Sequence, residues 1–176
     1  MQPDDDRRPA LIRSWWKELQ SDLGARAKLR RCRTPIEALA LPTTIDLMVR
    51  LGWKAPEQDQ SDWFAERIAA AAMVLAHVRE DSTQPVARSL GRQRGRDQPV
   101  LSSSRWERLC RAEGHENIAT EFTRIVQMIG GTANVVDLVF AILWWDHNTN
   151  HRTKQQWIYA YHGVDMPMQN NSASAV

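Results

Sequence analysis

The chain has 176 residues, of which 43% are hydrophobic, so it is long enough for one domain or two small subdomains around a buried core. Charged residues make up 25%, which is ordinary for a globular protein, and the formal net charge is +2. The total charge therefore says little about binding partners, and the distribution of charge along the chain is more informative. The eight tryptophans lie mostly inside periodic apolar segments, and this placement favours core packing over base stacking.

The first two predicted helices come directly after the acidic start of the chain. Leu11, Trp15 and Leu19 recur at i, i+4 and i+8, which is typical of a helix with one apolar stripe. Gly24 is expected to end this helix, and a second helix is expected to begin near Ala25.

Three more helices are predicted in the N-terminal half. The motif Thr34-Pro35-Ile36-Glu37 is a capping box with proline at the first helical position, which indicates a new short helix. Pro42 opens the next helix, and Gly52 stops it. The alanine-rich stretch from Ser61 to about Val78 predicts a long, well-buried helix.

Residues 79–104 differ in composition from the rest of the chain. They contain glycines, prolines and three consecutive serines, which predict a linker or long mobile loop with one short helix around Val86–Leu90. We therefore expect two small helical-bundle subdomains joined by a Gly/Pro/Arg-rich linker. The predicted organisation is an N-terminal helical subdomain at 9–80, a basic linker at 81–104, a C-terminal bundle at 105–163 and a flexible tail at 164–176.

The C-terminal half predicts four more helices. Ser104 and Glu107 form a capping box for a helix through Ala112, and Gly130-Gly131 is a signal that ends the helix after it. Asn134 can cap the apolar helix that follows. No segment alternates with a period of two residues, so no sheet is expected and the fold class is all-α. The last three of these helices are expected at about 116–129, 135–145 and 151–161.

The totals also bear on the cellular setting. Cys32 and Cys110 form no CxxC pair and are typical of reduced thiols in a cytoplasmic protein. The polar, acidic start does not resemble a secretory signal. The longest apolar run, residues 135–145, contains Asp137 and is too short to span a bilayer. We therefore expect a cytoplasmic protein with no membrane partner.

The sharpest feature of the sequence is a run of five cations without an acid. They are Arg26, Lys28, Arg30, Arg31 and Arg33. On a helix the intervening residues Ala25, Leu29 and Cys32 would face the core, with Arg26, Arg30 and Arg33 as one exposed stripe and Lys28 and Arg31 on the other flank. Like charges one turn apart repel, and the phosphates of a nucleic acid would remove that repulsion. A solvated basic face is the alternative interpretation.

A second basic cluster lies between residues 86 and 111. Its cations are all arginines, and guanidinium groups favour planar, bidentate contacts with phosphate. The only acidic residues in this stretch are Asp97 and Glu107. The alternative is an arginine-rich disordered linker. The seven arginines are Arg88, Arg92, Arg94, Arg96, Arg105, Arg108 and Arg111.

No catalytic motif stands out. His147 and His151 are four residues apart, like paired metal ligands on a helix, but the segment around Asn148 predicts a turn that would spoil the spacing. A metal-dependent hydrolase using these histidines with Asp146 is therefore a disfavoured hypothesis. We expect no metal, no cofactor and no enzymatic activity.

Several motifs, in order from about residue 10 to residue 163, together resemble the CasB family, the small subunit of the type I-E CRISPR Cascade complex. After the tryptophan-containing first helix, these motifs are Gly24-x-Arg26-Ala27-x-Leu29-Arg30-Arg31, Leu51-Gly52-Trp53, Ser89-Leu90-Gly91-Arg92, Arg105-Trp106-Glu107-Arg108-Leu109-Cys110-Arg111-Ala112, Leu143-Trp144-Trp145 and the last helix at 154–161.

The resemblance implies a non-catalytic, all-α protein present as two copies in Cascade. Its partners would be the backbone and large subunits, guide RNA, target DNA and the displaced DNA strand of the R-loop. By motif position, Arg26, Arg30 and Arg31 would form a first contact site. Arg92, Arg105, Arg108 and Arg111 would form a second, with Arg152 and Lys154 as further contacts. The segment Asp146-His147-Asn148-Thr149-Asn150 departs from the basic sequence expected after the paired tryptophans. The alternative function is a helical interaction module whose basic faces bind acidic partners.

Overall fold

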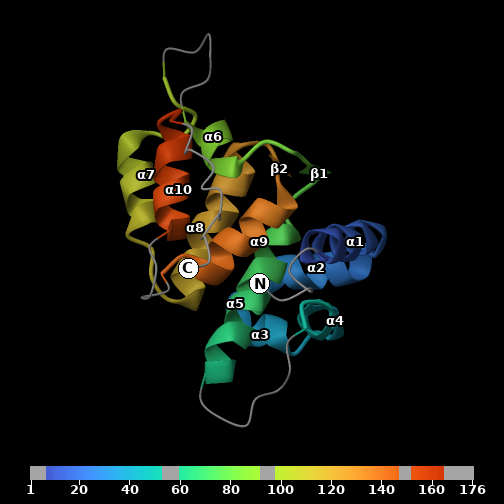
Figure 1. Cartoon of the computed structure of the whole chain (residues 1–176). Helices are drawn as coiled ribbons and strands as arrows, with labels where there is room; N and C mark the ends of the chain where they lie inside the picture. The colour runs from blue at the N-terminus through green and yellow to red at the C-terminus, as the bar shows by residue number, and fades with distance from the viewer. Residues whose placement is uncertain (1–6, 53–59, 92–97, 147–151, 165–176) are drawn as a thin grey trace, which may run out of the picture.

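The computed structural model describes residues 7–52, 60–91, 98–146 and 152–164, and within them the chain is almost entirely helical (Figure 1). The predicted all-α class is therefore confirmed. The described elements are α1 (Arg8–Ser21), α2 (Leu23–Arg31), α3 (Pro35–Leu39), α4 (Pro42–Arg50), α5 (Gln60–Leu75), β1 (Glu80–Asp81), α6 (Val86–Leu90), α7 (Ser103–Cys110), α8 (His115–Met128), β2 (Thr132–Ala133), α9 (Val135–Trp144) and α10 (Arg152–Tyr161).

Helix α5 is the centre of the molecule. It packs against α3 and α4 on one side and against α8 and α9 on another, and α2 also contacts it. Ile68 and the four alanines at 69–72 have no exposed surface. Alanine side chains let neighbouring helices approach closely, and a helix that is apolar all round is one that is buried all round. This explains why the predicted alanine-rich helix is the one around which the others assemble (Figure 1).

The first two helices are separated by Asp22 and not, as predicted, by Gly24. The backbone of Asp22 leaves the helical region, and its Oδ1 accepts a hydrogen bond from the N–H of Ala25 at 2.8 Å. Asp22 is therefore the N-cap of α2, and Gly24 lies inside the first turn of that helix. A carboxylate that satisfies the open N–H groups of a new helix decided the boundary, since glycine costs little in an exposed first turn.

Three other helix ends test the capping predictions. Thr34 caps α3 by accepting from the N–H of Glu37 (3.3 Å), and Asn134 caps α9 by accepting from the N–H groups of Val136 (3.1 Å) and Asp137 (3.0 Å), as predicted. The predicted box at Ser104 is wrong. Ser102 is the N-cap of α7, Ser104 is already helical, and the helix ends at Cys110.

The turn after α8 agrees with its two glycines. Gly130 and Gly131 both have positive φ angles, 73° and 84°. The N–H of Gly131 donates to the carbonyl of Val126 at 2.9 Å, which closes the end of the helix as glycine-terminated helices commonly do. The predicted end of this helix is confirmed.

The expectation of no sheet is wrong by two short strands. β1 and β2 pair in parallel, with Glu80 opposite Thr132 and Asp81 opposite Ala133. Strands of two residues carry no alternation that a sequence could reveal. They tie the segment after α5 to the loop between α8 and α9, and the N–H of Val135 donates to the Asp81 carboxylate at 3.1 Å.

Five of the seven tryptophans in the described residues confirm the expectation of core packing, whereas Trp63 is half-buried and Trp144 is 38% exposed. Trp15, Trp16, Trp106, Trp145 and Trp157 are all at most 6% exposed. The indole N–H of Trp15 donates to the Thr43 carbonyl (3.0 Å), and that of Trp145 to the Leu109 carbonyl (3.1 Å). Buried indoles therefore join helices that are distant in sequence by both packing and hydrogen bonds.

The predicted division into subdomains stays a prediction. The short helix at Val86–Leu90 is present as α6, but residues 92–97 of the predicted linker lie outside the described residues. The buried residues on both sides of the predicted boundary form one hydrophobic cluster, with α1 and α5 packed against α9. In the part of the chain that the structure describes, no helix is both long and apolar enough to cross a membrane.

Candidate nucleic-acid interface

Helix α2 displays its cations because its apolar residues face the core. Leu29 has no exposed surface, and Ala25 and Cys32 pack against the buried cluster, as the sequence predicted. The helix ends at Arg31, since Cys32 has an extended ψ of 133°. Arg33 therefore lies in the turn before α3, and its predicted place on the helical stripe of Arg26 and Arg30 is wrong.

Four cations of this segment are exposed. Among the described residues, none of their side chains has a hydrogen bond or ion pair with a carboxylate. The nearest acid, Glu37, accepts from the backbone N–H of Arg33 (2.8 Å) and not from its guanidinium. The four cations are Lys28, Arg30, Arg31 and Arg33, and we call them the α2 cluster.

Arg26 has a different environment from the α2 cluster. It donates from Nε to the carbonyl of Ala76 (2.9 Å) and from Nη2 to the carbonyl of Val78 (3.1 Å), so it caps the end of α5. Burial lowers the pKa of Arg26, and the positive charges of Arg30 and Arg79 lower it further. Arg26 thus anchors α2 on α5, and the predicted contact of this residue with nucleic acid stays a prediction.

Three basic residues beside α2 were missed by the sequence prediction. Arg79 follows the end of α5 and is close enough to Arg26 to influence its pKa, and His77 stands two residues earlier. Burial lowers the pKa of His77, with Arg30 and Arg26 adding to the effect. Arg124 on α8 lines the same cavity as Arg30. His77 and Arg79 follow α5 and Arg124 lies on α8, so only the packing of α2, α5 and α8 brings them near the cations of α2.

The second predicted cluster, on α7, is largely paired with carboxylates. Trp106 and Leu109 are buried and point inward. Arg108 Nε lies 3.0 Å from Glu121 Oε2, and Arg111 Nη2 lies 2.8 Å from Glu107 Oε2. Glu121 is only 4% exposed and also pairs with Arg124. These pairs reduce the charge that α7 offers to a partner.

The other predicted contact residues are scattered. Arg105 is exposed on α7, and Arg88 is half-buried on α6 and has an interaction of its own. Arg152 is exposed on α10, where Lys154 holds its Nζ 5.7 Å from the ring centre of Trp145, a cation–π contact. The three remaining loop arginines, Arg92, Arg94 and Arg96, lie outside the described residues.

The two basic helices lie at opposite sides of the molecule. Figure 1 shows α7 and α10 side by side at the left and α2 at the right, with α9 and α5 between them. Helix α8 nevertheless connects their charges, because Arg124 lines a cavity with Arg30 and shares the Glu121 carboxylate with Arg108 of α7.

The hypothesis of a metal site gains no support from Asp146. Its carboxylate accepts from the N–H of Gly114 (3.0 Å) and pairs with Arg67, whose side chain has no exposed surface. Burial by itself would raise the pKa of Asp146, but the Gly114 N–H and the Arg67 charge outweigh it and hold the pKa below its ordinary value. His147 and His151 lie outside the described residues, within which no group of three metal-ligating side chains occurs.

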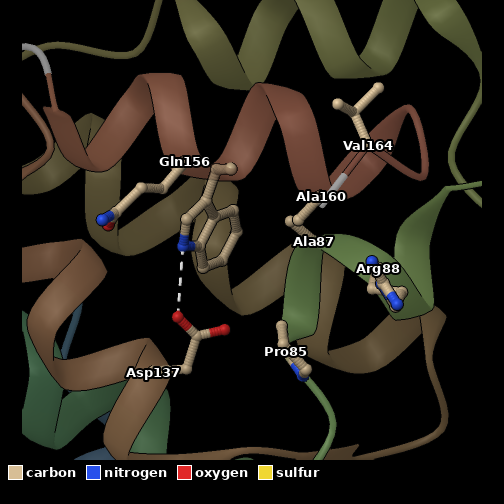
Figure 2. Close-up of a pocket in the computed structure, with 8 residues that line it drawn as sticks. Pro85, Ala87, Arg88, Asp137, Gln156, Ala160 and Val164 are labelled. Atoms are coloured by element: carbon tan, nitrogen blue, oxygen red, sulfur yellow. Dashed lines mark hydrogen bonds between the residues drawn. The ribbon is translucent and has the colours of Figure 1, made fainter. Parts of the chain in front are cut away.

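The cavity shown in Figure 2 has a structural explanation. It has a volume of about 370 Å³ and lies between α6, α9 and α10. Its half-buried carboxylate, Asp137, accepts from the N–H of Val86 (2.7 Å) and from the indole of Trp157 (3.2 Å). Burial raises the pKa of Asp137, and these two donors act against that rise. The Asp137 carboxylate thus joins α9 to α6 and α10. Figure 2 shows Arg88 and Gln156 on opposite sides of the cavity.

Fold and site together define an all-α protein with an exposed cationic segment and a second, carboxylate-paired basic helix. The family described as CRISPR-associated protein Cse2 matches residues 25–162 of this chain. The chain therefore belongs to the Cse2 family, and the predicted membership in the CasB family of type I-E Cascade is confirmed. No curated protein and no solved structure matches it.

Proposed function

We propose that this chain is a small subunit of a Cascade complex and holds guide RNA, target DNA and the displaced strand through sequence-independent contacts with phosphate. Its family, that of a structural small subunit of this multisubunit complex in CRISPR defence, supports the proposal. The observation that carries the proposal is the α2 cluster: four exposed cations within six residues, none of them neutralised by a carboxylate in the described structure.

Sequence-independent contacts suit this role physically. Opening a target duplex against a guide RNA exchanges one duplex for another of similar stability, so the free-energy change is close to zero. A few contacts to a displaced strand can then decide how much of the open state is populated. Because the target differs with every guide, the contacts have to use the phosphate backbone and not the base edges.

The α2 cluster is the primary contact surface in this proposal. One guanidinium group can donate two parallel hydrogen bonds to the oxygens of a phosphate, and helix α2 holds Arg30 and Arg31 in place. Removing the repulsion between cations one turn apart adds a few tenths of a kcal/mol per pair. The remaining residues, Arg26, Arg88, Arg92, Arg94, Arg105, Arg108, Arg111, Arg152 and Lys154, are proposed as secondary contacts. Arg108 and Arg111 would first have to exchange a carboxylate partner for phosphate.

The test is retention of target DNA by a Cascade complex assembled with the double variant Arg30→Glu/Arg31→Glu. We expect the complex to assemble and to release target DNA faster, with a weaker dependence on salt. The matched control is Arg7→Glu/Lys17→Glu, which makes the same change of charge at two exposed positions of the α1 region. Unchanged retention in the α2 variant contradicts the proposal. Failed assembly with intact DNA binding favours the interaction-module alternative.

A further inference from the structure

A small cavity lies where α2, α5 and α8 meet, and the function proposed above does not use it. Its volume is about 260 Å³. Leu29, Met73 and Ala119 form its apolar floor, and each is at most 8% exposed. The Cys32 thiol and the basic and hydroxyl groups of α2, α8 and the turns after α2 and α5 complete the lining: Arg30, Arg33, His77, Thr120, Thr123 and Arg124.

The charge around this cavity is one-sided. Among the described residues, no carboxylate lines it. Arg30 and Arg33 have no side-chain partner in the described structure, and Arg124 pairs with Glu121, which Arg108 shares. Three arginines thus line one cavity, and Glu121, which lies outside the lining, neutralises only Arg124 among them. Such an arrangement costs repulsion unless an anion occupies it.

His77 reports the same electrostatic environment independently. Burial is the main reason for its lowered pKa, and the charges of Arg30 and Arg26 are the next. The ionisable groups that line the cavity with His77 are Arg30, Cys32 and Arg33 from α2 and the turn after it and Arg124 from α8, and Arg26 acts on the histidine electrostatically. An anion between them would offset the positive potential at the imidazole.

We propose that this cavity binds one phosphate group of the strand that contacts the α2 cluster, with Arg30, Arg33 and Arg124 around its oxygens and His77 as a further donor. The inference rests on the proposed function and deepens it by locating a defined phosphate site. Guanidinium groups on three sides suit a tetrahedral anion better than a planar carboxylate, which offers only two oxygens. The apolar floor can contact the carbons of the attached sugar, and the Thr123 hydroxyl can donate to an oxygen.

The first test measures binding of a fluorescent 20-residue oligothymidylate to the full chain over a range of salt concentrations. We expect Arg33→Gln and Arg124→Gln each to weaken binding several-fold and to reduce the slope of log K against log salt by about 0.7, the value for one lost contact with a single strand. Lys17→Gln removes the same charge from an exposed position of α1 and should change neither quantity beyond a minor amount. A thermal melt of each variant controls for folding. Arg124→Gln also breaks the ion pair with Glu121, whereas Arg33 has no side-chain partner in the described chain. Weaker binding by Arg33→Gln therefore cannot come from the loss of an ion pair within the described structure.

The second test uses the pH dependence of the histidine. The pKa of His77, followed by the NMR signal of its ring, should rise on saturation with the oligonucleotide, whereas the ring signal of the exposed His162 should not respond. Oligonucleotide binding should tighten several-fold between pH 7.5 and pH 5.5 in the wild type and much less in His77→Gln.

Thymidine monophosphate and inorganic phosphate, titrated separately, distinguish a site for any phosphate from one that needs the strand. A glutamate-rich peptide that shifts the His77 signal more than the oligonucleotide does would overturn the assignment in favour of an acidic protein partner.

The outcomes separate this inference from the proposed function. If Arg30→Glu/Arg31→Glu abolishes binding of the oligonucleotide while Arg33→Gln, Arg124→Gln and His77→Gln behave like Lys17→Gln, the phosphate site is wrong and the proposed function stands. If the wild-type chain and its Cascade complex both fail to hold DNA through α2, the function itself is wrong. A His77 signal that does not respond to any anion also overturns the site.

Discussion

Helices α2 and α7 both carry several cations, four on α2 and two on α7 with Arg111 just after its end, but these cations have different partners. The α2 cluster has no carboxylate partner in the described structure, whereas Arg108 and Arg111 on α7 pair with Glu121 and Glu107. The difference comes from neighbours: α8 places a buried carboxylate against α7, but it faces α2 with Arg124. Two basic helices can therefore differ as binding surfaces, because carboxylates on neighbouring elements decide how much of their positive charge is available to a partner.

The largest expected effect is on DNA binding by α2. Arg30→Glu/Arg31→Glu should weaken binding of a single-stranded oligonucleotide on the order of 10- to 100-fold at low salt, because two phosphate contacts are lost and two repulsive charges are added. Arg108→Glu/Arg111→Glu makes the same charge change on α7 and should weaken it about threefold or less, since these charges are already screened by carboxylates. Fluorescence anisotropy measures both. Equal losses from the two helices would break the comparison.

A second prediction concerns Glu121, the acid that distinguishes the two surfaces. Glu121→Gln leaves Arg108 and Arg124 without their shared carboxylate, and we expect a loss of about 1–2 kcal/mol in unfolding free energy, reduced by the half-exposure of both arginines. The same variant should bind the oligonucleotide more tightly than the wild type, because the freed arginines become available. Denaturant unfolding and anisotropy are the measurements. Glu107→Gln, which breaks an exposed pair, is the control for stability and should cost far less. Weaker binding by Glu121→Gln would contradict the interpretation.

Within α2 itself, Arg26 and Arg30 should separate structure from binding. Arg26→Gln loses the two hydrogen bonds to the end of α5, and we expect it to lower the unfolding free energy by about 1–2 kcal/mol. Arg30→Gln should leave stability within about 0.5 kcal/mol of the wild type, because its side chain is exposed, and should weaken binding instead. Urea denaturation decides between them. If both variants keep full stability, Arg26 does not anchor the helix.

The smallest expected effect is the pH dependence of stability in the α2 region. Burial, together with Arg30 and Arg26, holds the pKa of His77 in the folded chain below its ordinary value of 6.5. The unfolded chain then binds more protons between the folded and unfolded pKa values, so stability falls as the pH drops below about 6.5. His115, whose pKa is lowered by burial and by Arg67, contributes with the same sign.

His77→Gln should therefore flatten the dependence of the melting temperature on pH between 7.5 and 5.5. The exposed His162→Gln is the matched control and should leave the dependence as it is in the wild type. Measurement in buffer without phosphate or sulfate keeps anions from occupying the cavity beside His77. A steeper dependence in His77→Gln than in the wild type would mean that the folded chain raises the pKa of this histidine instead of lowering it.

The helix boundaries show which parts of the fold could be predicted from the sequence. Caps that act within a few residues, such as Thr34 and Asn134, could be recognised because donor and acceptor are neighbours along the chain. The boundaries at Asp22 and Ser102 were missed because several neighbouring residues there could serve as the N-cap. The two strands were missed because each has only two residues and its partner lies some 50 residues away.

The residues of the chain by themselves determined the helical class, the burial of most of the described tryptophans and the exposure of Lys28, Arg30 and Arg31. These properties follow from spacing along one helix, which needs no knowledge of neighbours. Only the tertiary structure decided which cations have carboxylate partners, that Arg26 is bonded to α5, and that His77 and Arg124 join the α2 cluster around one cavity. Electrostatic interactions act through space between segments far apart in the chain, so their balance depends on how the helices pack.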